Sequence, residues 1–280
     1  MNRLTEDKRM LEYGLMLPYS NIFCFSTTRH GGFGEGTYDS FNCTPYTGDD
    51  SRDVLKNQAM LRGLLPVPNE LVIPYQIHDT RVLVVDDEYI FASEAKRYNS
   101  LQGIDALITN CPGLCLCVST ADCVPVLLYD REHQVIAAVH AGWRGTAAHI
   151  VEMVLQRMSS VFGTRGEGVV ACIGPSISLE AFETGDEVYR IFQEKGFPME
   201  RISRRNVHTG KWHLNLWEAN RLQLSNYGVP EQQIEISGIC TYNRYEDFFS
   251  ARRLGLKSGR ILSGIMIIKE SNDMHNRANC

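Results

Sequence analysis

Short apolar runs, rich in valine, isoleucine and leucine and bounded by glycine, proline or charged residues, dominate the pattern of this chain. Runs of this kind are typical of buried strands. They predict strands at residues 21–28, 70–77, 81–85, 104–109, 114–119, 124–129, 135–140, 168–177, 233–239 and 261–268.

Apolar residues recur with helical spacing in four other segments. The pattern predicts helices at 51–65 with Ser51 as the N-cap, at about 145–161, near 185–195 and near 215–227. Strands and helices are mixed without strict alternation, which favours an α/β fold with mixed sheets flanked by helices over a doubly wound parallel sheet. We predict that residues 1–280 form a single domain.

Composition narrows the setting of the protein. Charged residues make up 22% of the chain and its formal net charge is −5, which gives no basic surface for nucleic acid or anionic membranes. No apolar run reaches the ~18 residues that cross a bilayer, and the charged N-terminal residues lack a signal-peptide core. We expect a cytoplasmic protein, a monomer or homodimer, that binds neither nucleic acid nor membrane.

The chain has nine cysteines, an odd number, and most of them lie inside apolar runs. Reduced thiols in a cytosolic protein explain this pattern better than a disulfide framework does. Cys115 and Cys117 are expected to point to opposite faces of a strand, so we do not predict a metal site from this pair.

Three side chains lie where strands are predicted to begin or end. His78 closes the apolar run 71–78, His140 closes the run 134–140, and Cys123, next to Asp122, precedes the run 124–130. Side chains from separate strands converge at the ends of a sheet. Two imidazoles and a thiolate match an open zinc site with three protein ligands. A packed histidine and a Cys123–His140 catalytic pair fit the same pattern.

Longer blocks of sequence carry a more specific signal. STADCVPVLL…AAVHAGWRGT, within residues 119–146, resembles the signature of the multicopper polyphenol oxidase, or laccase-domain, family, whose members are also described as purine nucleoside phosphorylases and adenosine deaminases. The chain departs from the family pattern at Phe41, at Ala181 or Phe182, and at Asn243. The resemblance covers about 21–268 and continues, in order, in FSTTRHGGFGEGTYDSFN, TGDD, YQIHDTRV, IDALITNCPG, CIGPSISLEAFETG and CTYNRYEDFFSARRLGLKSGR.

The resemblance implies the laccase-domain fold, an α/β architecture related to the cysteine-hydrolase-like fold of a bacterial toxin class. It also implies a metal site of His78, Cys123 and His140, with Zn²⁺ as the expected ion and Cu²⁺ as the alternative. We predict that these ligands are catalytic together with Asp122, whose carboxylate is the candidate proton carrier. The residues predicted to bind substrate are Arg29, Asn42, Arg144, Phe249 and Arg252.

The activity implied by the resemblance is phosphorolysis of adenosine, inosine and 5′-methylthioadenosine, together with deamination of adenosine. Arg29 and Arg144 lie in glycine-flanked turns, where a guanidinium can hold phosphate. The alternatives are copper-dependent polyphenol oxidation and, less favoured, a Cys–His amide hydrolase. A blue-copper laccase needs several copper sites, which eight histidines without a His-x-His pair do not readily supply.

Overall fold

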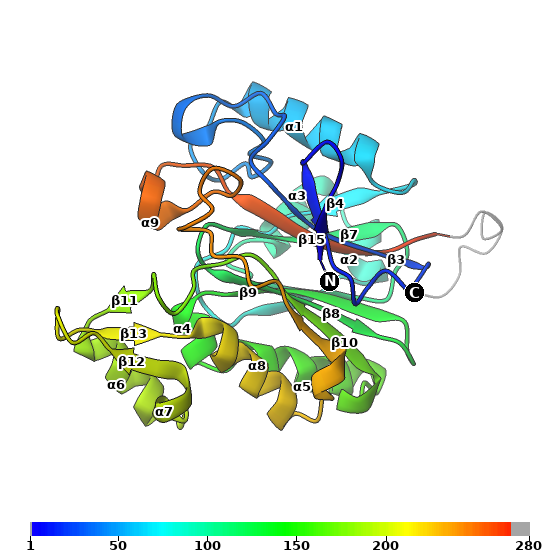
Figure 1. The fold of residues 1–280 in the computed structure, drawn as a ribbon. Coiled ribbons are helices and arrows are strands. Elements are labelled where there is room, and N and C mark those ends of the chain that lie inside the picture. Colours follow the sequence, from blue (N-terminus) through cyan, green and yellow to red (C-terminus); the bar gives the residue numbers. More distant parts are fainter. Residues whose placement is uncertain (1, 270–280) are drawn as a thin grey trace.

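The computed structural model describes residues 2–269, which form two facing six-stranded sheets with helices on their outer sides (Figure 1). In the first sheet, β4 pairs with β7 in parallel and the other neighbours are antiparallel. The strand order of this sheet is β1 (Arg3–Leu4), β2 (Met10–Glu12), β3 (Ile22–Thr27), β15 (Ile261–Ile267), β7 (Leu114–Thr120) and β4 (Glu70–Val72).

The second sheet is also mixed. Its outer pairs, β14 with β10 and β5 with β6, are parallel, whereas the pairs between them are antiparallel. The strand order is β14 (Ile234–Ile236), β10 (Val169–Ile173), β8 (Val124–Asp130), β9 (Val135–Ala141), β6 (Ala106–Thr109) and β5 (Val82–Val84). The predicted α/β fold with mixed sheets and flanking helices is therefore confirmed.

Burial on both faces explains why the central strands are almost wholly apolar. In β8, Leu127 and Tyr129 pack between the two sheets, whereas Val126 and Leu128 pack toward helices α5 (Ile150–Phe162) and α8 (Leu216–Asn226). Each fully buried valine or leucine contributes ~1.5–3 kcal/mol relative to an exposed one. A third core fills the space between the first sheet and helix α1 (Ser51–Leu64).

Shorter elements join these layers. A small sheet of β11 (Glu183–Thr184), β13 (Trp212–Leu214) and β12 (Ser203–Arg205) lies at one side of the second sheet, beside α6 (Asp186–Glu194) and α7 (Met199–Ile202) (Figure 1). The sequence pattern did not predict this sheet or strands β1 and β2, because strands this short carry too little periodicity. The remaining α-helices are α2 (Asp87–Phe91), α3 (Glu94–Ser100), α4 (Trp143–Ala147) and α9 (Ala251–Leu254).

Several predicted boundaries are wrong. Strand β4 ends at Val72, not at residue 77, so His78 lies in a loop rather than at a strand end. The helix predicted at 145–161 is divided into α4 and α5, because His149 between them has a left-handed φ of 59°. The N-cap of α1 is Asp50, whose carboxylate accepts a hydrogen bond from the backbone N–H of Arg52.

The predicted orientation of Cys115 and Cys117 is also wrong. Residues two apart on a strand share one face, and their Sγ atoms lie 3.6 Å apart in the core beneath α1. Burial is the main cause that raises the pKa of the Cys117 thiol well above its usual range. No helix within residues 2–269 has both the length and the apolar composition needed to cross a membrane.

Candidate metal centre

Three side chains far apart in the sequence converge where β8 begins and β9 ends. The ligand atoms of His78, Cys123 and His140 all lie within 4.8 Å of one another. Cys123 immediately precedes β8, and His140 pairs with Pro125 of that strand. His140 is buried, Cys123 is half-buried and His78 is exposed, so the group is closed on the protein side and open on the other.

A buried carboxylate holds two of these three residues in place. Asp105, which is fully buried, accepts hydrogen bonds from the backbone N–H groups of Ile77, His78 and Asp79 at 3.2, 3.0 and 2.9 Å. The same carboxylate accepts a bond from Nδ1 of His140 at 2.7 Å. One side chain therefore fixes both the loop that carries His78 and the imidazole of His140. Sequence reasoning missed Asp105, although an aspartate directly before a buried strand was a usable signal.

The bond to Asp105 also sets the chemistry of His140. Because Nδ1 is hydrogen-bonded to the carboxylate, Nε2 is the ring atom left to bind a metal or a proton. Burial opposes the charge on His140, but Cys123 and Asp105 outweigh it and raise its pKa to about 9. Burial likewise opposes the Cys123 thiolate, and the two nearby imidazoles outweigh it and lower its pKa to about 6.

Gly142 leaves the space that the three ligands occupy. A Cβ atom at this position would lie 3.1 Å from Sγ of Cys123, 3.2 Å from Cδ2 of His78 and 3.6 Å from Cε1 of His140. Its φ of −63° is available to any residue, so close approach, not backbone conformation, requires the glycine.

Backbone conformation is unusual at two positions beside the ligands. His78 has a φ of 64° and Asp122 has a φ of 86°, a region that residues other than glycine seldom occupy. Hydrogen bonds fix the second position, because the Asp122 carboxylate accepts from the Thr241 hydroxyl and from the backbone N–H of Arg252, both at 2.7 Å. Asp122 therefore ties the turn before Cys123 to the C-terminal part of the chain. Its role as a proton carrier stays a prediction.

A cavity of about 230 Å³ opens over the three ligands. Tyr46 and Tyr75 stand on one wall, edge to face with ring centroids 5.1 Å apart. Gln76 braces the loop before His78, because its side-chain amide donates to the Ser119 carbonyl at 2.9 Å and accepts from the Ser119 N–H at 2.7 Å. The other lining residues are Thr44, Thr47, Pro74, Thr120, Ala121, Ala251, Leu256 and Arg260.

The residues predicted to bind substrate do not line this cavity. Arg29 donates to the backbone carbonyls of Asp39 at 2.6 Å and Tyr245 at 2.8 Å, and it lies over the ring of Phe249, 5.1 Å from its centroid. Phe249 itself is fully buried. These contacts join two loops, and a substrate-binding role of Arg29 and Phe249 stays a prediction.

The other three predicted residues have similar surroundings. Asn42 is fully buried and donates to the Asp49 carboxylate at 2.8 Å. The guanidinium of Arg144 lies over the neighbouring Trp143 ring at 4.3 Å, and that of Arg252 lies over Phe182 at 5.6 Å. Of the arginines in the described chain, the cavity is lined by Arg260, which sequence reasoning missed although it ends one of the blocks that carry the family resemblance.

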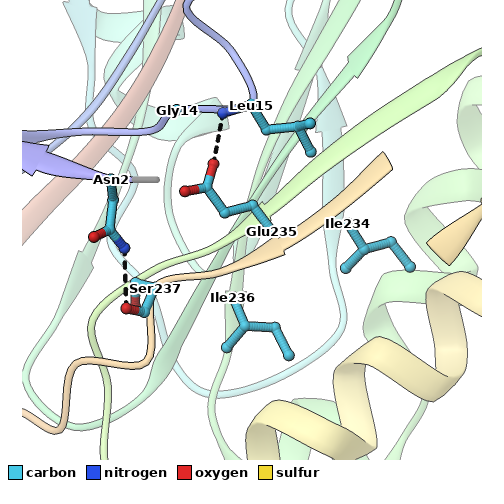
Figure 2. A pocket seen from close by; sticks show the side chains of 7 residues that line it. All are labelled: Asn2, Gly14, Leu15, Ile234, Glu235, Ile236 and Ser237. Atoms are coloured by element: carbon cyan, nitrogen blue, oxygen red, sulfur yellow. Dashed lines mark hydrogen bonds between the residues drawn. The ribbon is translucent and has the colours of Figure 1, made fainter. Parts of the chain in front are cut away.

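A second and larger cavity, of about 560 Å³, lies along edge strand β14. Figure 2 shows that its polar side chains are satisfied by nearby backbone: Glu235 accepts from the Leu15 N–H at 2.7 Å, and Asn2 donates to the Ser237 carbonyl at 2.9 Å. No histidine or cysteine lines it. Among residues 2–269, the His78–Cys123–His140 group is the one set of three or more such side chains with metal-binding spacing.

Comparison with known proteins identifies the family and agrees with the fold. Residues 23–268 match the family model described as multi-copper polyphenol oxidoreductase laccase. The match covers most of the chain, and the protein therefore belongs to this family, as the sequence blocks predicted.

Relatives extend over almost the whole chain. A protein of Bacteroides thetaiotaomicron named purine nucleoside phosphorylase is 60% identical over 270 residues, which cover 96% of this chain and 100% of that one. A protein named adenosine deaminase RL5, from an unknown prokaryotic organism, is 40% identical and covers 87% of this chain and 93% of its own. The crystal structure of Bacillus licheniformis YfiH superposes with a TM-score of 0.85 at 30% identity, covering 96% of this chain and 99% of that one.

Proposed function

We propose that this protein is a metal-dependent purine nucleoside enzyme, which cleaves adenosine, inosine and 5′-methylthioadenosine with phosphate and deaminates adenosine. The observation that carries the proposal is the His78–Cys123–His140 group at the floor of a cavity with an aromatic wall. The names of the relatives support the choice of purine nucleosides as substrates.

The donor atoms suit Zn²⁺, which takes thiolate and imidazole ligands. His78, Cys123 and His140 would hold the ion, and three protein ligands leave a coordination position for water or substrate. When bound, Zn²⁺ supplies Lewis acidity that polarises a substrate oxygen or activates water at neutral pH. Copper also binds two imidazoles and a thiolate, so the proposal for zinc requires direct metal analysis.

The remaining residues of the site bind and orient. Tyr46 and Tyr75 offer aromatic surface to a purine ring, and an edge-to-face pair holds each ring in a fixed orientation. Asp105 fixes the backbone of His78 and the imidazole of His140 relative to each other. Asp122 does not line the cavity and its carboxylate accepts from the Thr241 hydroxyl and the Arg252 N–H, so proton transfer during deamination would require it to turn toward the cavity.

A second candidate function rests on the same residues used differently. Cys123, His140 and Asp105 have the order of a thiol nucleophile, its base and the carboxylate that orients the base. A Cys–His amide hydrolase would need this trio but not His78. The role of His78 therefore separates the two proposals.

One panel of assays tests both proposals. We expect freshly purified protein to contain about one zinc per chain, and His78→Ala to lose both the metal and turnover. Free base released only when phosphate is present identifies phosphorolysis, and inosine formed from adenosine identifies deamination. Full activity in His78→Ala together with none in Cys123→Ala would support the hydrolase instead. A phenolic dye oxidised only with added Cu²⁺ would support the oxidase.

A further inference from the structure

Arg260 brings a cation into the cavity without an acidic partner. It immediately precedes β15 and is half-buried. No carboxylate among residues 2–269 lies within ion-pair distance of its guanidinium. Burial lowers the pKa of Arg260, and the charges of Cys123 and Asp122, which act on it without ion-pair contact, offset only part of this cost. The remaining cost favours a site that is completed by a directly bound anion.

The hydrogen bonds of Arg260 fix its guanidinium and leave part of it open. Nη1 donates to the carbonyls of Ser258 at 2.6 Å and Gly259 at 3.0 Å, and to the Ser258 hydroxyl at 3.3 Å. Nη2 donates to the Leu256 carbonyl at 3.0 Å. Within the described chain, Nε–H and the second Nη2–H have no acceptor. An arginine held by its own loop is preorganised to donate its remaining protons to a ligand.

Thr120 supplies a second group without a partner. It is the last residue of β7 and pairs with Ile261 of the neighbouring strand β15. Ile261 is the residue that follows Arg260. It lines the same cavity and its side chain is 1% exposed. Its hydroxyl is among the few buried side-chain groups of residues 2–269 that make no hydrogen bond. Buried hydroxyls without a partner are uncommon and call for a ligand or a water.

The rest of the lining favours an anion over a cation. The cavity is lined by hydroxyl, amide, aromatic and apolar side chains, the metal-ligand set and one guanidinium, and no aspartate or glutamate is among them. Arg29 and Arg144, which the sequence suggested for phosphate, lie outside this lining.

We propose that Arg260 and Thr120 bind inorganic phosphate beside the candidate metal centre, as the phosphate subsite of phosphorolysis. This inference rests on the proposed function. In the reaction, an oxygen of HPO₄²⁻ forms a bond to C1′ of the ribose while the C1′–N9 bond breaks. The electron pair of the broken bond leaves with the purine, which takes up the proton of the phosphate, and the products are ribose 1-phosphate and the free base. Arg260 stays protonated throughout and stabilises the phosphate charge.

Steady-state kinetics of Arg260→Gln and Arg260→Lys test the subsite. We expect KM for phosphate to rise on the order of tenfold to hundredfold, because hydrogen bonds to a charged group are lost. The increase in KM for inosine should be at least tenfold smaller. Lysine should rescue only part of the loss, since it lacks the planar fork. A rise confined to KM for inosine would overturn the proposal.

A matched control separates binding from bracing of the loop. Arg131 also donates to backbone carbonyls, of Gly168 at 3.2 Å and Glu167 at 2.9 Å, and it lies outside the cavity. Arg131→Gln should therefore leave KM for phosphate unchanged. An equal rise of KM in both variants would show that loop bracing, not phosphate binding, causes the effect.

Thr120→Val gives an independent measure. The variant keeps the shape of the side chain and removes a hydroxyl that has no partner, so the ligand-free protein should be as stable as the wild type or slightly more stable. We expect KM for phosphate to rise roughly threefold to tenfold, as for one hydrogen bond. A loss of stability without a change in KM for phosphate would assign Thr120 to the fold.

Direct binding keeps this inference separate from the proposed function. Titration of metal-free protein with inorganic phosphate, followed by calorimetry without nucleoside, should give heat for the wild type and Arg131→Gln and none for Arg260→Gln. If the wild type binds phosphate but cleaves no nucleoside, the proposed function fails and the oxyanion site stands. If adenosine 5′-monophosphate binds through Arg260 and inorganic phosphate does not, the site is for a phosphate ester and this proposal is wrong.

Discussion

Two aspartate–histidine pairs, each with a buried aspartate, lie at opposite ends of the β8–β9 hairpin, and only one belongs to the candidate metal centre. Asp105 accepts from Nδ1 of His140 at 2.7 Å, and Asp130 pairs with Nδ1 of His133 at 2.8 Å. Both carboxylates are fully buried and both also accept hydrogen bonds from backbone N–H groups. By hydrogen-bond geometry alone, the two pairs are equivalent.

The difference lies in what surrounds the second ring nitrogen. The side chain of His140 is 2% exposed and lies beside Cys123 and His78, whereas that of His133 is 37% exposed and belongs to no such group within the described residues. A buried aspartate that holds a histidine is therefore a general way to fix a turn. It becomes a reactive site only where further donor atoms converge on the same imidazole.

Replacement of each aspartate should separate the two roles most strongly. Asp105→Asn places an amide donor among four hydrogen-bond donors, so at least one of them loses its acceptor. We expect zinc affinity, measured by competition with a chelator, to fall by about 10–100-fold. Urea unfolding should show a loss of about 3–5 kcal/mol, as when one partner of a buried pair is removed.

Asp130→Asn is the control for this change, because it breaks the equivalent pair outside the metal centre. It should also reduce the free energy of unfolding, since a buried carboxylate with several partners is replaced. Zinc affinity should not change. Comparable losses of zinc affinity in both variants would mean that the hairpin loosens as a whole and that Asp105 has no special role.

Two glycines, Gly142 beside the metal ligands and Gly163 beside His133, should give smaller effects. A substitution at the first should affect zinc binding, and one at the second should affect stability. Gly142 has an ordinary φ, and an added Cβ would press on Cys123 and His78. Gly163 has a φ of 81°, and the nearest atoms to its added Cβ would be those of the His133 ring, from 3.4 Å. Gly142→Ala should weaken zinc binding roughly tenfold while leaving the thermal transition in place. Gly163→Ala should cost about 1 kcal/mol of stability and leave zinc binding intact.

Two results would contradict the expected effects of these glycine substitutions. Wild-type zinc affinity in Gly142→Ala would show that the ligands do not need the space that this glycine leaves. Reduced zinc affinity in Gly163→Ala would show that strain at the far end of α5 reaches the metal centre, which lies at the other end of the hairpin.

The sequence predicted the central strands well because both faces of each are buried, so that apolar runs such as 124–129 are long and unbroken. It also isolated His78, Cys123 and His140. For His78 the predicted strand end is wrong, since the residue lies six positions beyond Val72, the last residue of a three-residue strand. Its position depends on Asp105, a contact across 27 residues of sequence that no local period reveals.

Side-chain partners account for the residues that the sequence misplaced. Arg29 and Arg260 are both arginines near glycines, and their sequence surroundings do not distinguish a guanidinium that joins loops from one that faces a cavity. Asp122 neighbours a ligand in the sequence, yet its left-handed backbone conformation directs the carboxylate to Thr241 and Arg252. Such partners are set by tertiary packing, which the pattern along the chain does not specify.

The smallest expected effect is an acid-dependent loss of stability at the Asp130 end. Burial disfavours the Asp130 carboxylate, but the hydrogen bonds it accepts outweigh burial and lower its pKa below the usual 3.8. The unfolded chain, in which an aspartate titrates near 3.9, therefore binds this proton more readily than the folded protein does. The stabilisation is present above that value and is lost as pH falls through the lower folded-state pKa.

In metal-free protein, the free energy of unfolding should decrease more between pH 5 and pH 3 for the wild type than for Asp130→Asn, by about 1 kcal/mol. Parallel curves for the two proteins would show that the Asp130–His133 pair stabilises the fold equally with and without its charge, and the two pairs would then differ in electrostatics as well as in surroundings.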